Sequence, residues 1–361
     1  MIIEDLLEEL VKQGGSDLHV SSNLQPAIRV DGKLRRIDVP ALTPSDVENL
    51  LFPMLSNEQR RKLEQEWELD FSYGIEGLSR FRVNIYKDKG NYAAAFRTIT
   101  TTVPNFEQLG LPEVVKRIAN SPRGLVLVTG PTGSGKSTTL AAMIDHINST
   151  KAEHILTIED PIEFVHTSKK SVVHQRELGM DTRSFANALK SALREDPDII
   201  LVGEMRDFET ISLALTASET GHLVFGTLHT SSASQTVDRI IDVFPEGQQQ
   251  QIRVQIANSL VAIFSQTLIP KTLPDGTKKG RVMAQEILVS NGAIANLIRE
   301  GKSAQLYSSI QMGQGQGMQT LEAALAKLCN EGLCTVDDAL AKTSKPEEFK
   351  RQLKEAQNPT V

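Results

Sequence analysis

The chain has 361 residues, 40% of them hydrophobic and 23% charged, which is enough apolar material for two domains and excludes a disordered chain. Acidic residues outnumber basic ones 45 to 39, and the net charge of −6 excludes a general electrostatic attraction to nucleic acid or to an anionic membrane. The acidic start, MIIEDLLEEL, does not predict a secretory signal, and no run of about 18 apolar residues predicts a membrane-spanning helix. Cys329 and Cys334 are expected to be ordinary thiols of a reducing compartment, since a disulfide framework or a zinc site needs more ligands.

Residues 1–100 predict a small α+β domain. The stretch PAIRVDGKLRRI has Asp31 and Gly32 between two alternating runs, which is typical of a tight hairpin turn. A second hairpin is predicted in SRFRVNIYKDKGNYAAAFRTI, with its turn at residues 89–91. Between the hairpins, residues 43–65 have apolar positions at helical spacing, and Thr43 and Ser45 are candidate N-caps.

Residues 101–112 have no clear periodicity and contain two prolines and a glycine, so we expect a linker there. From residue 113 to residue 361, strands that are apolar throughout alternate with helices. The strands are GLVLVTG, HILTIED, DIILVGE and HLVFGTLHT. This alternation predicts an α/β domain with a parallel sheet covered on both faces. A further strand, RVMAQEILV, precedes helices from about Gly292 and a loose tail, KEAQNPTV.

The segment GPTGSGKST, which begins at Gly130, matches the phosphate-loop pattern G-x-x-x-x-G-K-[ST] between a strand and a helix. Backbone amides of such a loop wrap a phosphate, and the helix adds the positive end of its dipole. We expect Lys136 to contact the β and γ phosphates of ATP and the Ser137 hydroxyl to bind Mg²⁺. The alternative, a glycine-rich surface turn, does not explain the strand and helix on either side. The predicted nucleotide-binding residues are Thr132, Gly133, Ser134, Gly135, Lys136, Ser137 and Thr138.

The strand DIILV ends at Gly203-Glu204, and ligands of parallel sheets lie beyond the carboxyl ends of the strands. Gly203 stands where many phosphate-loop enzymes have an aspartate that orients the metal, so we assign that work to Glu204. Glu204 is predicted to hold Mg²⁺ through water or to polarise the attacking water. The alternative is a solvated carboxylate paired with Arg206.

A second acidic group, Glu159, Asp160 and Glu163, follows the strand in ILTIEDPIEF. Pro161 forces the chain out of regular structure there. A carboxylate of this group that reaches hydrogen-bonding distance of water could be its general base, and we choose Glu163 for that role. Glu159 and Asp160 are candidates for sensing or structural roles. The alternative is an acidic turn that caps the next segment.

Two histidines, His222 and His229, stand at opposite ends of the strand in GHLVFGTLHT. Such a strand separates its ends by about 20 Å, so the two cannot share one metal ion. His229 is at the carboxyl end, on the phosphate side, and is the candidate sensor of the γ phosphate. His222, at the other end, is as readily a structural, hydrogen-bonded histidine.

Taken together, GPTGSGKST, ILTIEDPIEF, DPDIILVGEMRD and GHLVFGTLHT resemble the four conserved boxes of the secretion ATPases, in the same order. Within these, the chain is most similar to the retraction ATPases of type IV pili, the PilT group, and SDLHV, SRFRVN and ALREDPDII extend the similarity over nearly the whole chain. The resemblance implies a PAS-like first domain, a RecA-like second domain and a cytoplasmic homohexamer. It also implies ATP between the domains, closed by arginines, for which Arg82 and Arg97 are the matching candidates.

The same resemblance implies that the motor acts on an inner-membrane platform protein of the PilC kind at the base of the pilus. A second retraction ATPase is a further implied partner, and no nucleic-acid partner is expected. Assembly and type II secretion relatives have a longer amino-terminal region and a four-cysteine insert, which this chain lacks. One departure from the PilT group is Ala295 in AIANLIREGK, where the group has an arginine.

Three alternatives stay open at the level of the sequence. The first is an accessory retraction ATPase of the PilU type, which the change at Ala295 keeps in view. The second is a DNA-translocating RecA-like ATPase, against which the negative net charge argues. The third is a scaffold that binds ATP and barely hydrolyses it, against which Glu163, Glu204 and His229 argue together.

Overall fold

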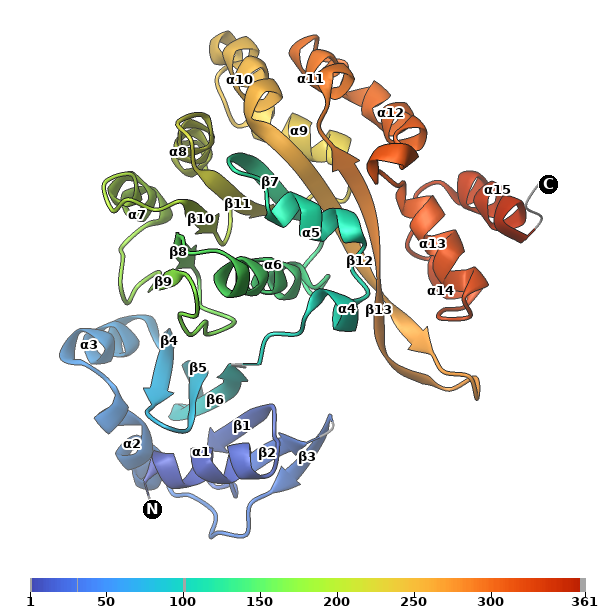
Figure 1. Cartoon of the computed structure of the whole chain (residues 1–361). Helices are drawn as coiled ribbons and strands as arrows, with labels where there is room; N and C mark the ends of the chain where they lie inside the picture. The colour runs from blue at the N-terminus through green and yellow to red at the C-terminus, as the bar shows by residue number, and fades with distance from the viewer. Residues whose placement is uncertain (1, 31, 100–101, 358–361) are drawn as a thin grey trace. The chain divides into compact units, whose positions relative to one another are not determined.

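The computed structural model describes residues 2–30, 32–99 and 102–357, and they form two compact units (Figure 1). The first unit comprises Met1–Thr102 with Pro161–Val165, and the second comprises Val103–Asp160 with His166–Val361. The α/β fold class is confirmed. The domain limits at residues 100 and 113 stay a prediction, and residues 100 and 101 lie outside the described part of the chain.

The first unit is a six-stranded antiparallel sheet in the order β3-β2-β1-β6-β5-β4. Leu7, Leu18, Phe81 and Phe96 are among the side chains of its core. Its strands are β1 Asp17–Ser21, β2 Ala27–Val30, β3 Lys33–Arg36, β4 Glu68–Ile75, β5 Ser79–Asp88 and β6 Asn91–Ile99. Its helices are α1 Ile3–Lys12, α2 Pro44–Leu51, the 3₁₀ turn η1 Phe52–Met54 and α3 Asn57–Glu66.

Both predicted hairpins of this unit are present. Strands β2 and β3 pair antiparallel across the turn that contains Gly32; Asp31, the other predicted turn residue, lies outside the described residues. Strands β5 and β6 are joined by Lys89 and Gly90, which both have positive φ (51° and 83°), as a two-residue turn that matches the strand twist requires.

The predicted helix over residues 43–65 is two helices. Thr43 caps α2, as predicted, and accepts a hydrogen bond from the Asp46 amide at 3.2 Å. Ser45 lies inside the first turn of α2 and is not its cap, so that prediction is wrong. Pro53 lies in the 3₁₀ turn that separates the two helices, and Ser56 caps α3.

The second unit is built on a seven-stranded sheet in the order β13-β12-β7-β11-β10-β8-β9. The four predicted strands, β7, β8, β10 and β11, are parallel, as predicted, and β9 and β12, which were not predicted, pair parallel with β8 and β7. Strand β13 pairs antiparallel with β12 at one edge. The strands are β7 Gly124–Thr129, β8 His154–Glu159, β9 Val172–Glu177, β10 Ile199–Val202, β11 Leu223–Leu228, β12 Leu260–Thr272 and β13 Lys278–Val289.

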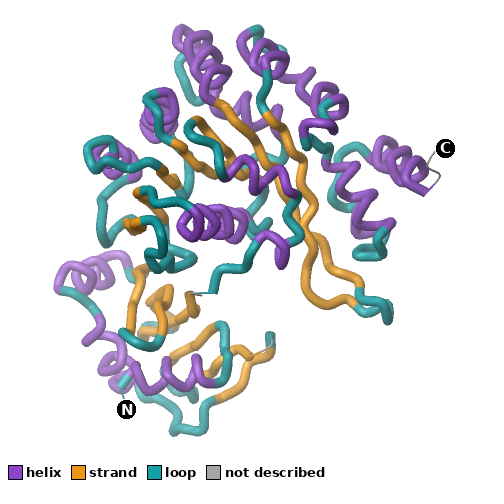
Figure 2. The backbone as a smooth tube through the Cα atoms, viewed as in Figure 1, coloured by secondary structure: helices purple, strands orange, loops and turns teal. Residues whose placement is uncertain are grey.

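Helices cover both faces of this sheet, as the apolar strands predict (Figure 2). Side chains of β7 alternate between two cores: Leu125 and Leu127 face one, and Val126 and Val128 face the other. The first core contains residues of α7 Phe185–Ala192, α8 Phe208–Glu219, α9 Ala233–Asp242 and α10 Glu246–Ser259. The second contains residues of α4 Phe106–Leu109, α5 Glu113–Ala119 and α6 Lys136–Thr150.

Helices follow β13 to the end of the chain, as predicted (Figure 1). They are α11 Gly292–Arg299, η2 Ser303–Gln305, α12 Leu306–Met312, η3 Gln314–Gln316, α13 Leu321–Asn330, α14 Val336–Leu340 and α15 Pro346–Gln357. The predicted loose tail from Lys354 is wrong as far as Gln357, because α15 extends to that residue; residues 358–361 lie outside the described part. Within the described residues, none of the helices is both long and apolar enough to cross a membrane.

Candidate functional site

The phosphate loop connects the buried strand β7 to helix α6. Gly130, directly after β7, has φ 139°, and a Cβ there would lie 2.3 Å from the carbonyl oxygen of Gln266. Gly135, which caps α6, has φ 88°, a left-handed conformation that favours glycine. These glycines are therefore required by the backbone path, and the loop has the strand and helix on either side that the sequence predicts.

Lys136, the first residue of α6, has its ammonium group folded onto the loop. Its Nζ donates to the carbonyl oxygens of Gly130 at 2.8 Å and of Pro131 at 3.2 Å. An ammonium group held at the loop itself is within reach of a phosphate that the loop wraps. Ser137 and Thr138 follow it in the first turn of α6, where the helix dipole favours anions.

The carboxyl ends of three neighbouring parallel strands bring the other predicted groups toward this loop. Strand β11 lies between β7 and β10. His229, which follows β11, is therefore positioned between the phosphate loop and Glu204, which follows β10. Because neighbouring strands are about 4.8 Å apart, the loop and Glu204 are separated by about 10 Å at the strand ends, which leaves room for a phosphate and a water.

Glu204 contacts both His229 and Arg206. Its Oε1 atom accepts a hydrogen bond from His229 Nε2 at 2.9 Å. The same oxygen forms an ion pair with Arg206 Nε. Its Oε2 atom has no hydrogen-bond partner within the described residues. Burial alone would raise the pKa of Glu204, but the hydrogen bond and charge of Arg206, together with His229, lower it below its ordinary value. The Glu204 carboxylate is thus ionised at neutral pH. The ion pair with Arg206, which the sequence offered as an alternative to a role at the nucleotide, is present in the structure.

Gly203 fits tightly against strand β8, which explains the absence of an aspartate there. A Cβ on Gly203 would lie 3.0 Å from the carbonyl oxygen of Ile158 and 3.2 Å from Cα of Glu159. The Gly203 carbonyl accepts a hydrogen bond from the Thr227 hydroxyl. The carboxylate therefore comes from the next residue, Glu204.

The three residues of the second acidic group, Glu159, Asp160 and Glu163, belong to different units: the first two to the second unit and Glu163 to the first. Glu159 accepts hydrogen bonds from Thr157 Oγ1 at 2.7 Å and Gln175 Nε2 at 3.1 Å, a structural arrangement at the end of β8. Asp160 is exposed and contributes to the electrostatic environment of Arg206. Glu163 is exposed and lies in Pro161–Val165, which belongs to the first unit. Its role as a general base stays a prediction.

His222 lies at the amino end of β11, away from the phosphate loop. Its Nδ1 atom is 3.0 Å from the carbonyl oxygen of Ala217 and 3.4 Å from the Thr220 hydroxyl. It also lines a polar hollow of about 180 Å³ with Asp198 and Glu153. These contacts favour the structural interpretation of His222.

Arg82 and Arg97 are directly opposite each other on β5 and β6 of the first unit. Arg82 is exposed, and the Arg97 side chain is 71% exposed with its Nε 2.9 Å from Asp17 Oδ1. Like charges directly opposite in a sheet are unfavourable, and the ion pair of Arg97 with Asp17 offsets part of that repulsion. Their part in nucleotide binding stays a prediction.

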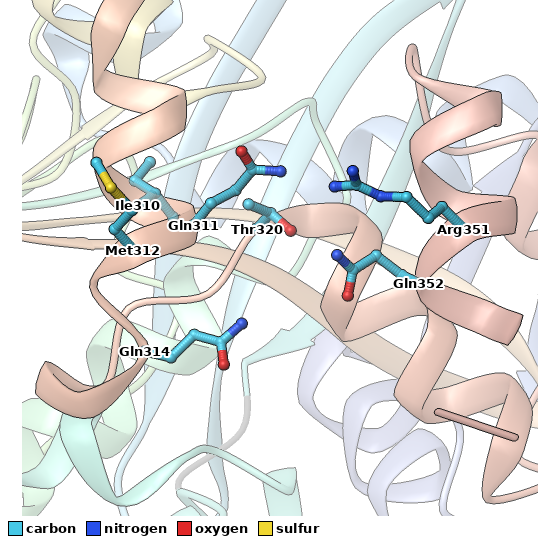
Figure 3. Close-up of a pocket in the computed structure, with 7 residues that line it drawn as sticks. All are labelled: Ile310, Gln311, Met312, Gln314, Thr320, Arg351 and Gln352. Carbon is cyan, nitrogen blue, oxygen red and sulfur yellow. The ribbon is translucent and has the colours of Figure 1, made fainter. Parts of the chain in front are cut away.

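A separate pocket of about 250 Å³ lies among the carboxy-terminal helices (Figure 3). Gln311 and Arg351 point toward each other across it, from α12 and α15, and both contact Glu348. Its lining has no histidine, cysteine or carboxylate, so it offers no group for water activation. It is not part of the nucleotide site.

Sequence reasoning missed the groups that support the phosphate loop from β12 and β13. Gln266 donates from Nε2 to the Ser134 carbonyl at 2.9 Å, and its Oε1 accepts from Thr139 and from Gln285, both at 3.1 Å. Gln266 and Gln285 are 3% and 2% exposed. The available signal was one amide in each of two largely apolar runs, VAIFSQTLI and VMAQEILV, since a buried amide needs partners.

Comparison with known proteins gives one consistent result. The family model described as "Type II/IV secretion system protein" matches residues 1–341. The "Type IV pilus retractation ATPase PilT" of Pseudomonas aeruginosa is 55% identical over 97% of this chain and 100% of its own length. The "Type IV pilus ATPase PilU" of the same organism is 38% identical, over 98% of this chain and 92% of its own.

Solved structures agree with these sequences. A crystal structure described as that of the pilus retraction motor PilT with bound ADP superimposes with a TM-score of 0.89 at 49% identity, over 97% of this chain and 99% of the other. That of the Legionella pneumophila ATPase DotB has a TM-score of 0.83 at 28% identity, over 94% and 95%. Both matches span the two units described above.

Proposed function

The chain belongs to the type II/IV secretion system protein family, and we propose that it is an ATP-hydrolysing motor that retracts type IV pili. The observation that carries the chemical part is the 2.9 Å contact between His229 and Glu204, which follow β11 and β10, the next two strands of the sheet after β7. The similarity to the PilT protein supports the mechanical part.

The donor groups of the site suit Mg²⁺ bound together with nucleotide. The Ser137 hydroxyl would be an oxygen ligand of the ion, and Glu204 would hold it through water; the ion would supply positive charge to the phosphates. Within the described residues, no group of three or more His, Cys, Asp and Glu forms a metal site by itself. Mg²⁺ commonly takes its other ligands from phosphates and water, and it neutralises phosphate charge.

The residues of the chain divide the work of hydrolysis. Lys136 leaves the carbonyl oxygens of Gly130 and Pro131 for the β and γ phosphates. Glu204, ionised because its pKa is lowered, orients the attacking water with its second oxygen, and His229 holds that carboxylate in place. A strongly basic group is not needed, because the transition state of phosphoryl transfer is loose. Its catalysis depends mainly on positioning the reactants and stabilising charge. Glu163 is the proposed acceptor of the water's proton.

The proposal extends to the assembled motor. Arg82 and Arg97 are assigned to the phosphates of the bound ATP, where guanidinium groups stabilise charge on the transferred group. The working form is a homohexamer at the cytoplasmic face of the inner membrane, where it acts on a platform protein at the pilus base. A second retraction ATPase is a further proposed partner.

An accessory retraction role of the PilU type is the second candidate, and Ala295 is the observation that favours it. Ala295 lies in α11, 8% exposed, within the core of the second unit. The identity to PilU, 38%, is lower than the 55% to PilT, which favours the principal motor.

The test is a count of surface pili on cells in which Lys136→Ala replaces the native protein. Excess filaments that no longer shorten are expected. The matched control is Lys190→Ala, an exposed lysine of α7 away from the loop, which should leave the count unchanged. Loss of filaments would make the protein an assembly motor, and a wild-type count would refute a principal role in retraction.

A further inference from the structure

Two consecutive residues of the edge strand β13, Gln285 and Glu286, point to opposite faces of the sheet at the level of the phosphate loop. Glu286 is in register with Ser265 of β12, which is in register with Thr129, the last residue of β7. Thr129 and Ser265 join their hydroxyls at 2.8 Å in the buried interior. Since successive side chains of a strand alternate between faces, Gln285 lies on the other face.

On its own face, Gln285 supports the phosphate loop. Its Nε2 donates to Gln266 Oε1 at 3.1 Å, and Gln266 in turn binds the Ser134 carbonyl. The hydrogen bonds from Gln285 to Gln266 and from Gln266 to Ser134 thus support the loop that is proposed to hold the phosphates.

On the opposite face, Glu286 holds the first residue of α9. Its Oε1 accepts a hydrogen bond from the backbone amide of Ala233 at 2.7 Å. Glu286 is only 5% exposed, and a buried carboxylate without a strong partner would be costly. Burial raises the pKa of Glu286 above its ordinary value, and the hydrogen bond from the Ala233 amide, at the amino terminus of α9, opposes that rise.

The residues that connect this anchor to the site form a short loop. His229 follows β11, and Ala233 is held at β13, three strands away in the sheet. Three strand spacings amount to about 14 Å, and the four residue steps from His229 to Ala233 reach about 14 Å when extended, so the loop has little slack. Ser232, at φ −149° and ψ 162°, is extended. The position of Ala233 therefore limits where His229 can lie.

The loop is also tied internally to the first turn of α9. The hydroxyls of Thr230 and Thr236 are 2.7 Å apart, and the Ser231 amide donates to Gln235 Oε1 at 3.2 Å. The loop and the start of α9 consequently move together, and Glu286 fixes both to the sheet.

We propose that Glu286 is a positioning residue for hydrolysis: through the Ala233 amide it fixes residues 229–232 and so keeps His229 in contact with Glu204. This rests on the proposed ATPase function. Glu286 acts on turnover, whereas Gln266 and Gln285 act on nucleotide binding, so one edge strand supports the two parts of the site separately.

The carboxy-terminal helices complete the surroundings of Glu286. Glu322 of α13 and Lys345, which precedes α15, are its charged neighbours. Glu322 is 3% exposed and accepts hydrogen bonds from Tyr307 at 2.9 Å and Thr343 at 2.6 Å. Ala233 is fully buried and Glu286 nearly so, which limits competition by water for the Ala233 amide.

The test compares ATP turnover and ADP affinity in the full-length protein. Glu286→Ala is expected to lower kcat about tenfold, the effect of one lost hydrogen bond, with ADP affinity unchanged. Glu286→Gln keeps an oxygen acceptor and is expected to restore most of kcat. Ala233→Pro removes the amide donor at the first helical position, where proline is tolerated, and should reproduce the loss. Gln266→Ala, as the contrasting variant, should weaken ADP binding.

Each outcome distinguishes this inference from the proposed function. If kcat of both Glu286→Ala and Ala233→Pro stays within about twofold of the wild type, the positioning role is refuted. It is also refuted if Glu286→Gln loses as much turnover as Glu286→Ala, or if Glu286→Ala weakens ADP binding as strongly as Gln266→Ala. A wild-type protein that does not hydrolyse ATP would instead refute the proposed function. Ala233→Pro provides the answer should Glu286→Ala fail to fold.

Discussion

His229 and Glu204 lie 25 positions apart in the sequence and meet at 2.9 Å, Nε2 to Oε1, beside the phosphate loop. An ionised carboxylate only accepts hydrogen bonds, so the histidine donates. This contact and the ion pair to Arg206 use the same oxygen, and the other oxygen has no hydrogen-bond partner within the described residues. This geometry supports the proposal that Glu204 is held by one oxygen and orients water with the other.

Replacing Glu204 with glutamine should abolish most turnover while leaving nucleotide binding intact. Glu204→Gln keeps the size of the side chain and removes the negative charge that orients the water. We expect kcat to fall about a hundredfold or more and ADP affinity to stay unchanged. Steady-state ATPase rates and ADP titration measure the two quantities. Glu209→Gln, an exposed position of α8, is the control, and equal turnover in both variants would contradict the role of Glu204.

Removing Arg206 should move the acid limb of the pH–rate profile upward. The pKa of Glu204 lies below its ordinary value of 4.5, because Arg206 and His229 outweigh burial, so activity that needs the carboxylate persists above that pKa and is lost as pH falls through it. In Arg206→Ala burial remains and the main opposing charge is gone, so the loss begins at a higher pH. The ATPase pH profile, with Arg239→Ala as an exposed control on α9, measures this. If the acid limb of the profile lay at the same pH in the wild type, Arg206→Ala and Arg239→Ala, the electrostatic role of Arg206 would be refuted.

The sequence predicted those parts of the site that are contiguous. The phosphate loop is nine consecutive residues whose spacing fixes their chemistry, and Glu204 and His229 could be placed because each follows an apolar strand. Gln266 and Glu286 could not be placed. Gln266 binds Ser134 across 132 positions, and that contact depends on the register of β12 against β7, which local patterns do not specify.

The same reason explains the errors at helix ends. Thr43 and Ser45 both suit an N-cap, and Pro44 between them decides the choice, because proline is favoured at the first helical position. The helical structure through Gln357 was missed because polar residues in KEAQ predict neither a face nor a cap. Local composition thus predicts that an element exists better than where it ends.

Arg82→Ala should reduce turnover without reducing stability. Arg82 is exposed and directly opposite Arg97, so its removal relieves a repulsion in the sheet. If it acts on the phosphates, kcat falls while the melting temperature stays the same or rises slightly. Arg35→Ala on the exposed strand β3 is the control for a lost surface arginine. A variant with wild-type kcat would remove Arg82 from the site.

The two thiols should react slowly in the folded protein. Cys329 and Cys334 have their Sγ atoms 3.4 Å apart, and burial raises the pKa of both, that of Cys334 to about 12. Because the thiolate is the nucleophile, alkylation by iodoacetamide at neutral pH should be about a hundredfold or more slower than in denaturant. Mass spectrometry of the alkylated chain measures both sites. Equal rates in the folded and unfolded protein would contradict the burial of this pair.

Gly203→Ala should damage the site by displacing the ends of two strands. The added Cβ would lie 3.0 Å from the Ile158 carbonyl and 3.2 Å from Cα of Glu159, and both are backbone atoms that cannot rotate away. Overpacking of this kind costs about 1–3 kcal/mol of unfolding free energy. It also shifts Glu204, the next residue, relative to His229, so turnover should fall further than ADP affinity. Gly247→Ala is the matched control, since nothing lies within 4 Å of its added Cβ in α10, and a helical Gly→Ala change stabilises. If Gly203→Ala were as stable and active as the control, the close approach of β8 and β10 could not be what requires glycine at this position.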